Sequence, residues 1–276
     1  MSIKQKISIV TVCYNSIDTI ERTIQSVLAQ DYDNIEYIVI DGGSTDGTVE
    51  VIKKYADCIS HWISEPDNGI YDAMNKGIAL ATGEWIHFRN SGDFFLRRES
   101  LTKFFLTPIA EDIMVVHGNC IYYDDSGWFE QTPPSLRVSY KKEIPVLHPA
   151  SFVRASVQKK IPFDLQYRSS ADYDFFYKCC QEGLKYEYRP IAIVAFAEGG
   201  FSSNWERAFW EDCKLQGLTN TPTGKLHAYL LFFQKKLMYI CSKLKEHTFL
   251  ANLHFHRRKA SVLSIKRHPL PVPSDF

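Results

Sequence analysis

The first 90 residues alternate β-branched runs with amphipathic segments, and this alternation constrains the fold more than any other feature of the chain. Residues 7–12 (ISIVTV) and 35–40 (IEYIVI) are typical of buried strands. Between them, residues 17–28 place apolar side chains on one helical face, and residues 70–80 predict another helix before a strand at residues 85–88. Repeated strand–helix–strand units favour the α/β class, a Rossmann-like, mainly parallel open sheet with helices on both faces.

Composition narrows the class of protein. The chain has 276 residues, 45% of them hydrophobic and 14% aromatic, which is enough to form a core in one domain or two small ones. It carries 32 Lys and Arg against 32 Asp and Glu, and this zero net charge argues against a partner bound by bulk attraction to nucleic acid phosphates. The opening residues, MSIKQKISIVTV, lack the apolar core of a signal peptide, and no run reaches the roughly 18 to 20 apolar residues of a membrane span.

Cysteine usage points to a reducing compartment. The chain has seven cysteines, an odd number, scattered and never spaced as CxxC. A disulfide framework or a zinc ribbon is therefore not expected. We expect reduced thiols and a cytoplasmic location.

The last quarter of the chain is basic. Residues 213–276 carry 11 Lys and Arg against 2 Asp and Glu, whereas residues 1–212 carry 21 against 30. From Gly224 onward the pattern predicts a helix whose apolar residues recur four and three apart: Leu226, Leu230, Phe233, Leu237, Ile240 and Leu244. A basic amphipathic helix fits either an anionic membrane surface or a partner helix in a homodimer, and both alternatives stay open.

Polar side chains follow the predicted strands. Tyr14 and Asn15 follow the first strand, Asp41 the second, and Asp93 the strand at residues 85–88. In open α/β sheets, ligands bind at these carboxyl ends. A tyrosine can stack on a nucleobase, and a carboxylate can accept from a base or a ribose, or hold a divalent cation. Neither GxGxxG after the first strand nor GxxxxGK[ST] occurs, which disfavours dinucleotide oxidoreductases and P-loop enzymes.

Two N-terminal blocks resemble the family 2 glycosyltransferases with a GT-A fold, of the bacterial polysaccharide-assembly type. They are residues 8–48 and residues 64–93, the latter reading SEPDNGIYDAMNKGIALATGEWIHFRNSGD. A later His-Pro-Ala-Ser-Phe and an Ala-Asp-Tyr-Asp extend the resemblance to about residue 205. The resemblance implies inverting transfer of a sugar from a nucleoside diphosphate donor, expected to be UDP-linked, to a hydroxyl of a lipid-linked or growing oligosaccharide at the cytoplasmic face of the inner membrane.

The resemblance also implies where the donor binds. Carried over by position, Tyr14 and Asn15 border the nucleobase, Asp41 bonds it, and the segment from Asp67 to Asn75 wraps the donor. From the residues alone, Asp41 could equally cap the turn before two glycines. Asn75 could likewise serve as a cap or pair with a helix neighbour.

The metal-binding motif implied by the resemblance has fewer carboxylates here than in many relatives. Many relatives have two or three carboxylates where this chain reads Asn90-Ser91-Gly92-Asp93, so Asp93 is the expected metal ligand. One carboxylate and the donor's phosphate oxygens can still hold Mg²⁺ or Mn²⁺, because Mg²⁺ often keeps several waters. The turn at residues 199–202 is expected either to fold over the diphosphate through backbone N–H groups or to be a plain turn.

Asp172 is the expected catalytic base for the acceptor hydroxyl. It stands where the family shows its base, at the predicted start of a helix whose dipole favours the carboxylate. Asp174 ranks second because two residues along a helix it points elsewhere. His148 is expected to bind phosphate or acceptor, or to complete the metal shell, and a histidine satisfied within the core is the alternative.

These expectations divide the chain into three parts. Residues 1–97 form a nucleotide-sugar-binding half, residues 98–205 an acceptor-binding and catalytic-base half, and residues 206–276 a basic helical tail. The competing hypothesis is a catalytically weakened protein of the same fold that binds nucleotide sugars or acts as a scaffold.

Overall fold

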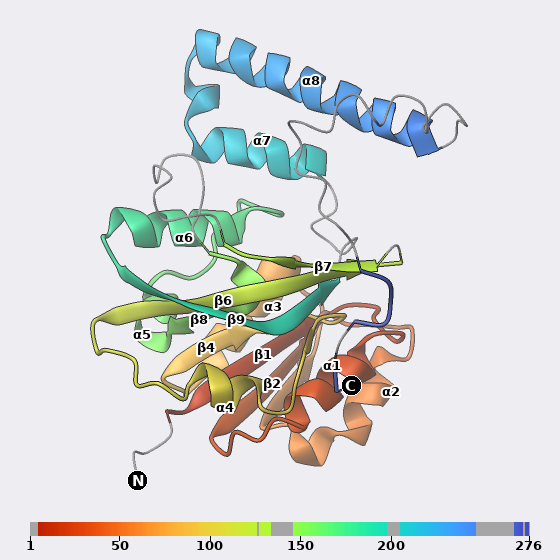
Figure 1. Ribbon diagram of the computed structural model, residues 1–276, viewed down its shortest axis with the longest axis vertical. Helices are drawn as coiled ribbons and strands as arrows, with labels where there is room; N and C mark the ends of the chain where they lie inside the picture. The colour runs from red at the N-terminus through yellow and green to blue at the C-terminus, as the bar shows by residue number, and fades with distance from the viewer. Residues whose placement is uncertain are drawn as a thin grey trace.

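A nine-stranded sheet runs through the body of the molecule in the computed structural model (Figure 1). The structure describes residues 5–125, 127–133, 146–197, 205–246, 268–272, 274 and 275. The strand order is β3-β2-β1-β4-β8-β6-β9-β5, and β7 pairs with β6. The predicted α/β class is confirmed.

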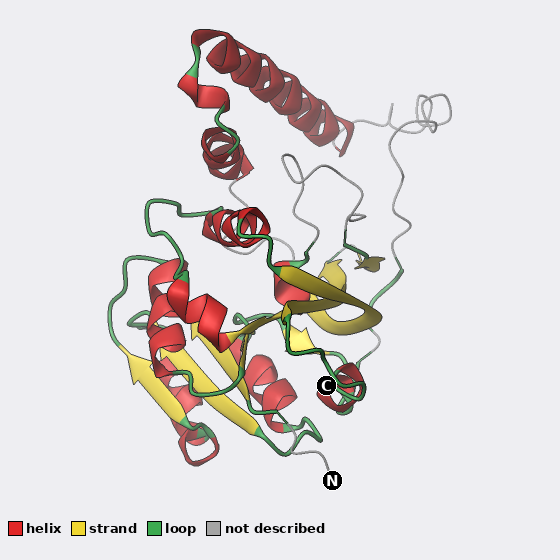
Figure 2. Ribbon diagram, turned by 90° about the vertical axis from the view of Figure 1, so that its left-hand side faces the viewer, coloured by secondary structure: helices red, strands yellow, loops and turns green. Residues whose placement is uncertain are grey.

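The N-terminal part of the sheet is parallel, as the sequence predicts. It contains β1 (Ile7–Cys13), β2 (Ile35–Asp41), β3 (His61–Ser64) and β4 (Trp85–Phe88). The connecting helices are α1 (Ile20–Leu28), α2 (Thr48–Lys54), the short 3₁₀ turn η1 (Ala56–Cys58) and α3 (Ile70–Leu80). Figure 2 shows helices on both faces of this part of the sheet.

The second part continues the same sheet with mixed strand directions. Its strands are β5 (Phe94–Phe95), β6 (Ile113–Asp124), β7 (Gly127–Gln131), β8 (Ser151–Arg154) and β9 (Lys185–Ala197). Its helices are α4 (Ser100–Phe104), η2 (His148–Ala150), α5 (Ala155–Lys160) and α6 (Ala171–Gln181). Strand β8 runs antiparallel to both β4 and β6 and so joins the two parts. The division expected near residue 97 therefore lies within one continuous sheet.

The two faces of β1 carry different halves of the core because successive strand residues point to opposite sides. Ile7 and Ile9 pack in one cluster with Ile24 of α1, whereas Val10 packs in another with Met74 of α3. All seven residues of β1 are buried. A strand covered on both faces is rich in apolar and β-branched residues, and the buried hydroxyls of Ser8 and Thr11 are hydrogen-bonded to Glu36 and Tyr37.

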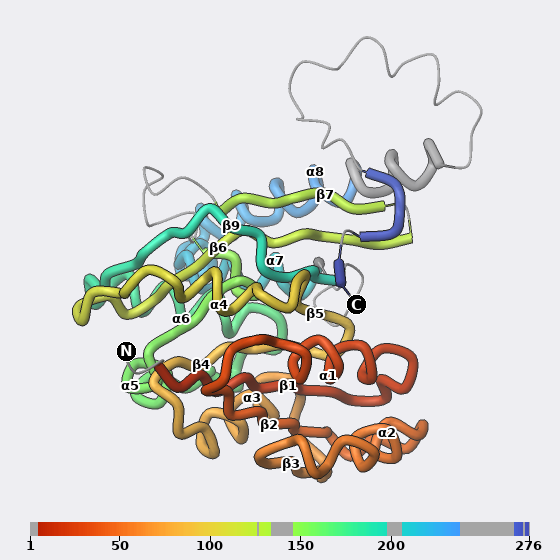
Figure 3. Tube along the Cα trace, turned by 60° about the horizontal axis from the view of Figure 1, so that its bottom comes forward, coloured from red at the N-terminus to blue at the C-terminus, as the bar shows by residue number. Residues whose placement is uncertain are grey.

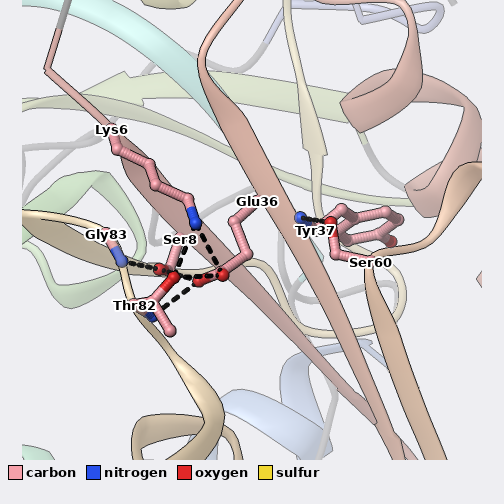
Figure 4. Close-up of polar contacts among 7 residues, drawn as sticks. All are labelled: Lys6, Ser8, Glu36, Tyr37, Ser60, Thr82 and Gly83. Carbon is pink, nitrogen blue, oxygen red and sulfur yellow. Dashed lines mark hydrogen bonds and ion pairs between the residues drawn. The ribbon is translucent and has the colours of Figure 1, made fainter.

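Glu36 is a buried carboxylate at the end of the sheet opposite the strand carboxyl termini, and Figure 4 shows its partners. It accepts hydrogen bonds from Lys6 Nζ at 2.9 Å, Ser8 Oγ at 2.5 Å and the Thr82 N–H at 2.7 Å. Burial alone would raise the pKa of Glu36, but these donors outweigh it and lower the pKa to about 2. The network ties β1, β2 and the turn after α3 together.

We expect Glu36 to make the stability of the fold depend on acid pH. A carboxyl whose pKa is lowered by folding stabilises the native state above its unfolded value, and this contribution disappears as the pH falls toward 2. A drop from 4.5 to about 2 corresponds to about 3 kcal/mol at neutral pH. Glu36→Gln should lower the free energy of unfolding by this order at pH 7 and by much less at pH 3, as measured by urea denaturation. Glu50→Gln, at an exposed position, is the control. If Glu36→Gln lowers the free energy of unfolding equally at both pH values, the stabilisation does not come from the ionised Glu36 carboxylate.

The C-terminal helices stand apart from the sheet, beyond α6, as Figure 2 shows. They are α7 (Trp205–Leu215), η4 (Leu218–Asn220) and α8 (Pro222–Glu246). The rings of Trp210 and Phe232 join α7 to α8 with centroids 5.1 Å apart. The helix predicted from Gly224 thus begins two residues earlier. In the part of the chain that the structure describes, no helix is long and apolar enough to cross a membrane.

After the helical tail, the last described residues return to the sheet. His268 pairs with Trp128 of β7, Val272 is buried, and Asp275 bonds Arg97 at 2.8 Å. Figure 3 shows this segment passing from β7 toward β5 and α1. Residues 247–267 and the side chains of Ile240 and Leu244, which belong to the predicted tail, lie outside the described residues.

Candidate functional site

A cavity of about 1020 Å³ opens at the carboxyl ends of β1 and β4. It brings together five of the eight predicted site residues: Tyr14, Asp67, Asp93, His148 and Asp172. These residues come from five separate segments, the furthest apart being 158 positions distant in the chain. The topology places them together because strands that end at one edge deliver their following loops to the same place.

Asp41 and Asn15 do not line this cavity, and their side chains hold a loop instead. Asp41 is fully buried, and its Oδ2 accepts from the N–H groups of Gly43 at 3.1 Å and Ser44 at 2.9 Å and from Ser64 Oγ at 2.7 Å. Asn15 has a left-handed φ of 46°, and its Oδ1 accepts from the Thr45 N–H at 3.0 Å. Of the two roles expected for Asp41, these contacts fit the turn cap.

Tyr14 and Asp67 form the outer wall of the cavity. Tyr14 is 63% exposed, which leaves its ring available to stack on a flat ligand. Asp67 Oδ1 accepts from the Gly69 N–H at 2.7 Å and so fixes the turn that leads into α3. A Cβ on Gly42 would lie 2.5 Å from Asp67 Oδ2, so a larger residue at position 42 would displace the Asp67 carboxylate.

Asn75 lies away from the cavity. Its amide donates to the Phe163 carbonyl at 2.9 Å and accepts from the Phe163 N–H at 2.9 Å. This paired contact fixes the segment before α6 to α3, a role that the sequence does not indicate. A direct contact of Asn75 with the donor stays a prediction that these contacts do not favour.

Asp93 lies at the cavity floor above a buried arginine. Its Oδ1 accepts from the Ala197 N–H at 3.1 Å. Burial raises the pKa of Asp93 to about 7, and the charge of Arg89 opposes that rise. Arg89 is fully buried, its Nη2 donates to the Pro149 carbonyl at 3.3 Å, and its guanidinium lies 4.5 Å from the ring centroid of Phe95.

Residues around Asp93 fit a divalent cation. Asn90 lines the same cavity, and its buried Oδ1 has no hydrogen-bond partner among the described residues. A carboxylate and an amide oxygen are the hard ligands that Mg²⁺ and Mn²⁺ prefer. No group of three or more His, Cys, Asp and Glu side chains suited to a metal occurs in the described ranges, so phosphate oxygens or waters would complete the coordination.

Asp172 is held by two partners and still faces the cavity. Tyr71 Oη donates to Asp172 Oδ1 at 2.9 Å, and His148 Nδ1 lies 3.3 Å from Oδ2. Burial acts to raise the pKa of Asp172, but His148 and Tyr71 outweigh it, so the net pKa lies below the usual value. Its side chain keeps 32% exposure. Asp172 is therefore an ionised, oriented carboxylate at the cavity wall.

Asp174 occupies a different environment. It is buried and bonds Lys178 at 2.6 Å, one turn along α6. It does not line the cavity. The ranking of Asp172 above Asp174 therefore agrees with their positions.

The positioning roles of three residues could not be inferred from the sequence. Tyr71 and Arg89 lie in the block at residues 64–93, but nothing in that block indicates these roles, although a charged residue at the end of an apolar strand is a usable signal for Arg89. Glu211 of α7 accepts from the N–H groups of Arg168, Ser169 and Ser170, at 3.0, 2.8 and 2.9 Å, and so caps the start of α6. The turn at residues 199–202 lies outside the described residues.

Sequence comparison identifies relatives over most of the sheet. The family model for glycosyl transferase family 2 matches residues 8–164, more than half of the chain. An uncharacterised glycosyltransferase of Mycobacterium tuberculosis is 34% identical over 182 residues, which is 61% of this chain and 66% of that protein, slightly under two thirds of its length. A PGL/p-HBAD biosynthesis glycosyltransferase of Mycobacterium bovis is 28% identical over 71% of this chain and 78% of its own.

Solved structures share the fold at low sequence identity. Staphylococcus aureus TarS, residues 1–349, in complex with UDP-GlcNAc, aligns with a TM-score of 0.62 and 20% identity, covering 81% of this chain and 69% of that one. The mannosyltransferase PcManGT of Pyrobaculum calidifontis, in complex with GDP-Man and Mn²⁺, aligns with a TM-score of 0.62 and 18% identity, covering 83% and 70%. These likenesses confirm the GT-A fold expected from the sequence.

Proposed function

The chain belongs to glycosyl transferase family 2, and from this membership we propose that it moves one sugar, with inversion, from a nucleoside diphosphate donor to a glycan hydroxyl. The observation that carries the proposal is the single cavity in which Tyr14, Asp67, Asp93 and Asp172 meet. An aromatic ring for a base, a hard oxygen ligand for a cation and an oriented carboxylate are the parts that this transfer needs.

The donor lies along the carboxyl ends of β1 and β4. Its base stacks on Tyr14, and its diphosphate extends past Asp67 toward Asp93. We propose a UDP-linked donor, which the UDP-GlcNAc named in the TarS structure supports. Asp41 and Asn15 act by holding the loop beside the base, since their side chains already bond that loop.

Asp93 and Asn90 would hold the divalent cation, and the Mn²⁺ named in the mannosyltransferase structure supports this assignment. A bound cation supplies positive charge that stabilises the departing diphosphate. Arg89 lies beneath them as a fixed positive charge. Its charge opposes part of the rise that burial causes in the pKa of Asp93, and so increases the fraction of Asp93 in the ionised form that binds metal.

Asp172 accepts the proton of the acceptor hydroxyl. The hydroxyl oxygen forms a bond to the anomeric carbon while the bond from that carbon to the diphosphate oxygen breaks, and the diphosphate leaves with the electron pair. One displacement inverts the anomeric centre. His148 and Tyr71 position the carboxylate, because each bonds one of its oxygens.

The acceptor is a lipid-linked glycan, and α8 brings the enzyme to its membrane. Leu226, Leu230, Phe233 and Leu237 lie on one face of α8 and are 53–70% exposed. Another side of the helix packs on Trp210 of α7 through Tyr229 and Phe232. An exposed apolar face in a basic segment is the arrangement of interfacial helices.

We expect Phe233→Ser with Leu237→Ser to abolish co-sedimentation with vesicles of phosphatidylglycerol and phosphatidylcholine. Both side chains are exposed, so their replacement leaves the fold intact, unlike deletion of the tail, which would also remove the contacts of Val272 and Asp275. His227→Ser, off the apolar face, is the control. Vesicle binding that persists while a dimer dissociates would instead support the partner-helix alternative.

Release of nucleoside diphosphate from a panel of donors, in the presence of Mn²⁺ and glycan acceptors, tests the transferase directly. We expect one donor to give turnover and to raise the melting temperature by mass action. Donor binding without release from any donor would favour the scaffold hypothesis.

A further inference from the structure

Three aromatic rings form a row across adjacent strands in the second part of the sheet. Tyr122 of β6 pairs in register with Phe129 of β7 on one side and with Phe196 of β9 on the other. The ring centroids of Tyr122 lie 5.6 Å from Phe129, nearly parallel, and 5.0 Å from Phe196. All three line the 1020 Å³ cavity. We call these three residues the aromatic row.

The aromatic row begins beside the reaction centre and lies away from the donor loops. Ala197, directly after Phe196, donates its N–H to Asp93 Oδ1 at 3.1 Å. In the sheet, β4 and β8 separate β1 and β2, which precede Tyr14 and Asp41, from β6. A ligand on the row therefore approaches Asp93 from the side opposite the base and does not compete with the nucleotide.

The width of the row sets the size of its ligand. Neighbouring strands lie about 4.8 Å apart, so three rings on three strands cover about 10 Å. That length suits two linked pyranose rings rather than one. The parts of these aromatic rings that reach the cavity attract the apolar C–H faces of such sugars and exclude water from them, and Phe129 is the most buried of the three.

Polar atoms in the same cavity favour a sugar over an apolar ligand. His148 Nε2 and Ser169 Oγ are buried, have no hydrogen-bond partner among the described residues, and belong to residues that line the cavity. Buried polar atoms without partners are rare and costly, so these two atoms favour a ligand that carries hydroxyl groups. A hydrocarbon chain or an aromatic aglycone would leave them unpaired.

From the row and these atoms, we propose that Tyr122, Phe129 and Phe196 form an acceptor subsite that binds the two terminal sugar rings of an oligosaccharide. This inference rests on the proposed glycosyl transfer and adds to it a minimum acceptor length. The ring nearest Asp93 presents the reacting hydroxyl, and the second ring lies further along the row.

The subsite can be tested by binding, without turnover. Saturation-transfer NMR would measure the affinity of methyl glycosides of common hexoses and N-acetylhexosamines, their disaccharides, and the matching phenyl monosaccharides. We expect a disaccharide to bind best. Phe196→Leu, which keeps an apolar side chain but loses the flat ring, should weaken its binding about tenfold, close to 1.4 kcal/mol. Phe196→Ala should weaken it at least as much.

Two controls separate this inference from the proposed function. Tyr188→Ala truncates an exposed ring of the same strand outside the cavity and should leave disaccharide binding unchanged. UDP is the second probe: it should bind wild type and Phe196→Leu equally, and failure of UDP to bind wild type would count against the proposed function alone. The subsite is overturned if Phe196→Leu leaves disaccharide affinity unchanged, if phenyl monosaccharides bind more tightly than disaccharides, or if no glycan binds.

Discussion

Asp172→Asn should lower the turnover number about 1000-fold while leaving donor affinity within twofold. The effect of a positioned base is typically 100- to 10,000-fold, and asparagine keeps the shape of aspartate but cannot take the proton. The donor loops bond elsewhere, so the change leaves them in place. Release of nucleoside diphosphate measures turnover, and calorimetric titration with the donor measures affinity.

Asp174→Asn is the matched control for this prediction. Asp174 lies two residues away on α6, is buried and bonds Lys178, so its replacement removes an ion pair without touching the cavity. It should lower the melting temperature more than the turnover number. If Asp172→Asn retains activity within a few-fold of wild type, or if Asp174→Asn is the less active variant, the base is assigned to the wrong residue.

Asp93→Asn should reduce turnover at least 100-fold and abolish tight Mn²⁺ binding in the presence of UDP. Asp93 is the sole carboxylate among residues 90–93, and asparagine supplies a neutral and weaker ligand. Electron paramagnetic resonance of Mn²⁺ would follow binding independently of activity. Excess Mn²⁺ should restore part of the activity, because weakened binding is compensated by concentration.

Asp112→Asn serves as the control for Asp93. Asp112 is exposed and pairs with Lys185 far from the cavity, so both turnover and Mn²⁺ binding should match wild type. Unchanged Mn²⁺ affinity in Asp93→Asn would remove Asp93 from the metal site. Full activity of wild type in a strong chelator would remove the metal from the reaction.

Three of the four strands in the parallel half, β1, β2 and β4, could be predicted from the sequence because each has a local signal, whereas β3 was not predicted. A run rich in β-branched residues, such as residues 7–12, has few alternatives to a buried strand when a helical period follows it. The mixed half could not be predicted in the same way. Strand β8 pairs with β4 and β6, which are distant in sequence, and no local pattern specifies such partners.

The cavity residues also differ in how far the sequence could predict their positions. Asp93 and Tyr14 follow strands, so topology alone predicts that they meet. The contacts of Asp172 with Tyr71 and His148 join segments 101 and 24 residues apart, and these contacts depend on how α3, η2 and α6 pack. The motif that contains Asn75 predicts a donor contact, but in the structure the Asn75 amide is hydrogen-bonded to the backbone of Phe163.

The charge and periodicity predicted a basic helical tail, and α8 agrees with it, but the return of the last described residues to the sheet was not predicted. Asp275 bonds Arg97, and Val272 is buried beside Phe94, so the C-terminal residues pack on the segment that follows Asp93. Nothing in the sequence around Val272 and Asp275 indicates that these residues pack on the sheet. The apolar face of α8, in contrast, could be predicted because its period is regular.

The anomeric configuration of the product is the most direct test of the proposed single displacement with Asp172 as base. Proton NMR of the first turnovers with an α-linked donor would report the anomeric configuration before any equilibration. Single displacement with Asp172 as base predicts a β-linked product throughout. An α-linked product would require a second displacement or a front-side attack, and would contradict the mechanism inferred from this cavity.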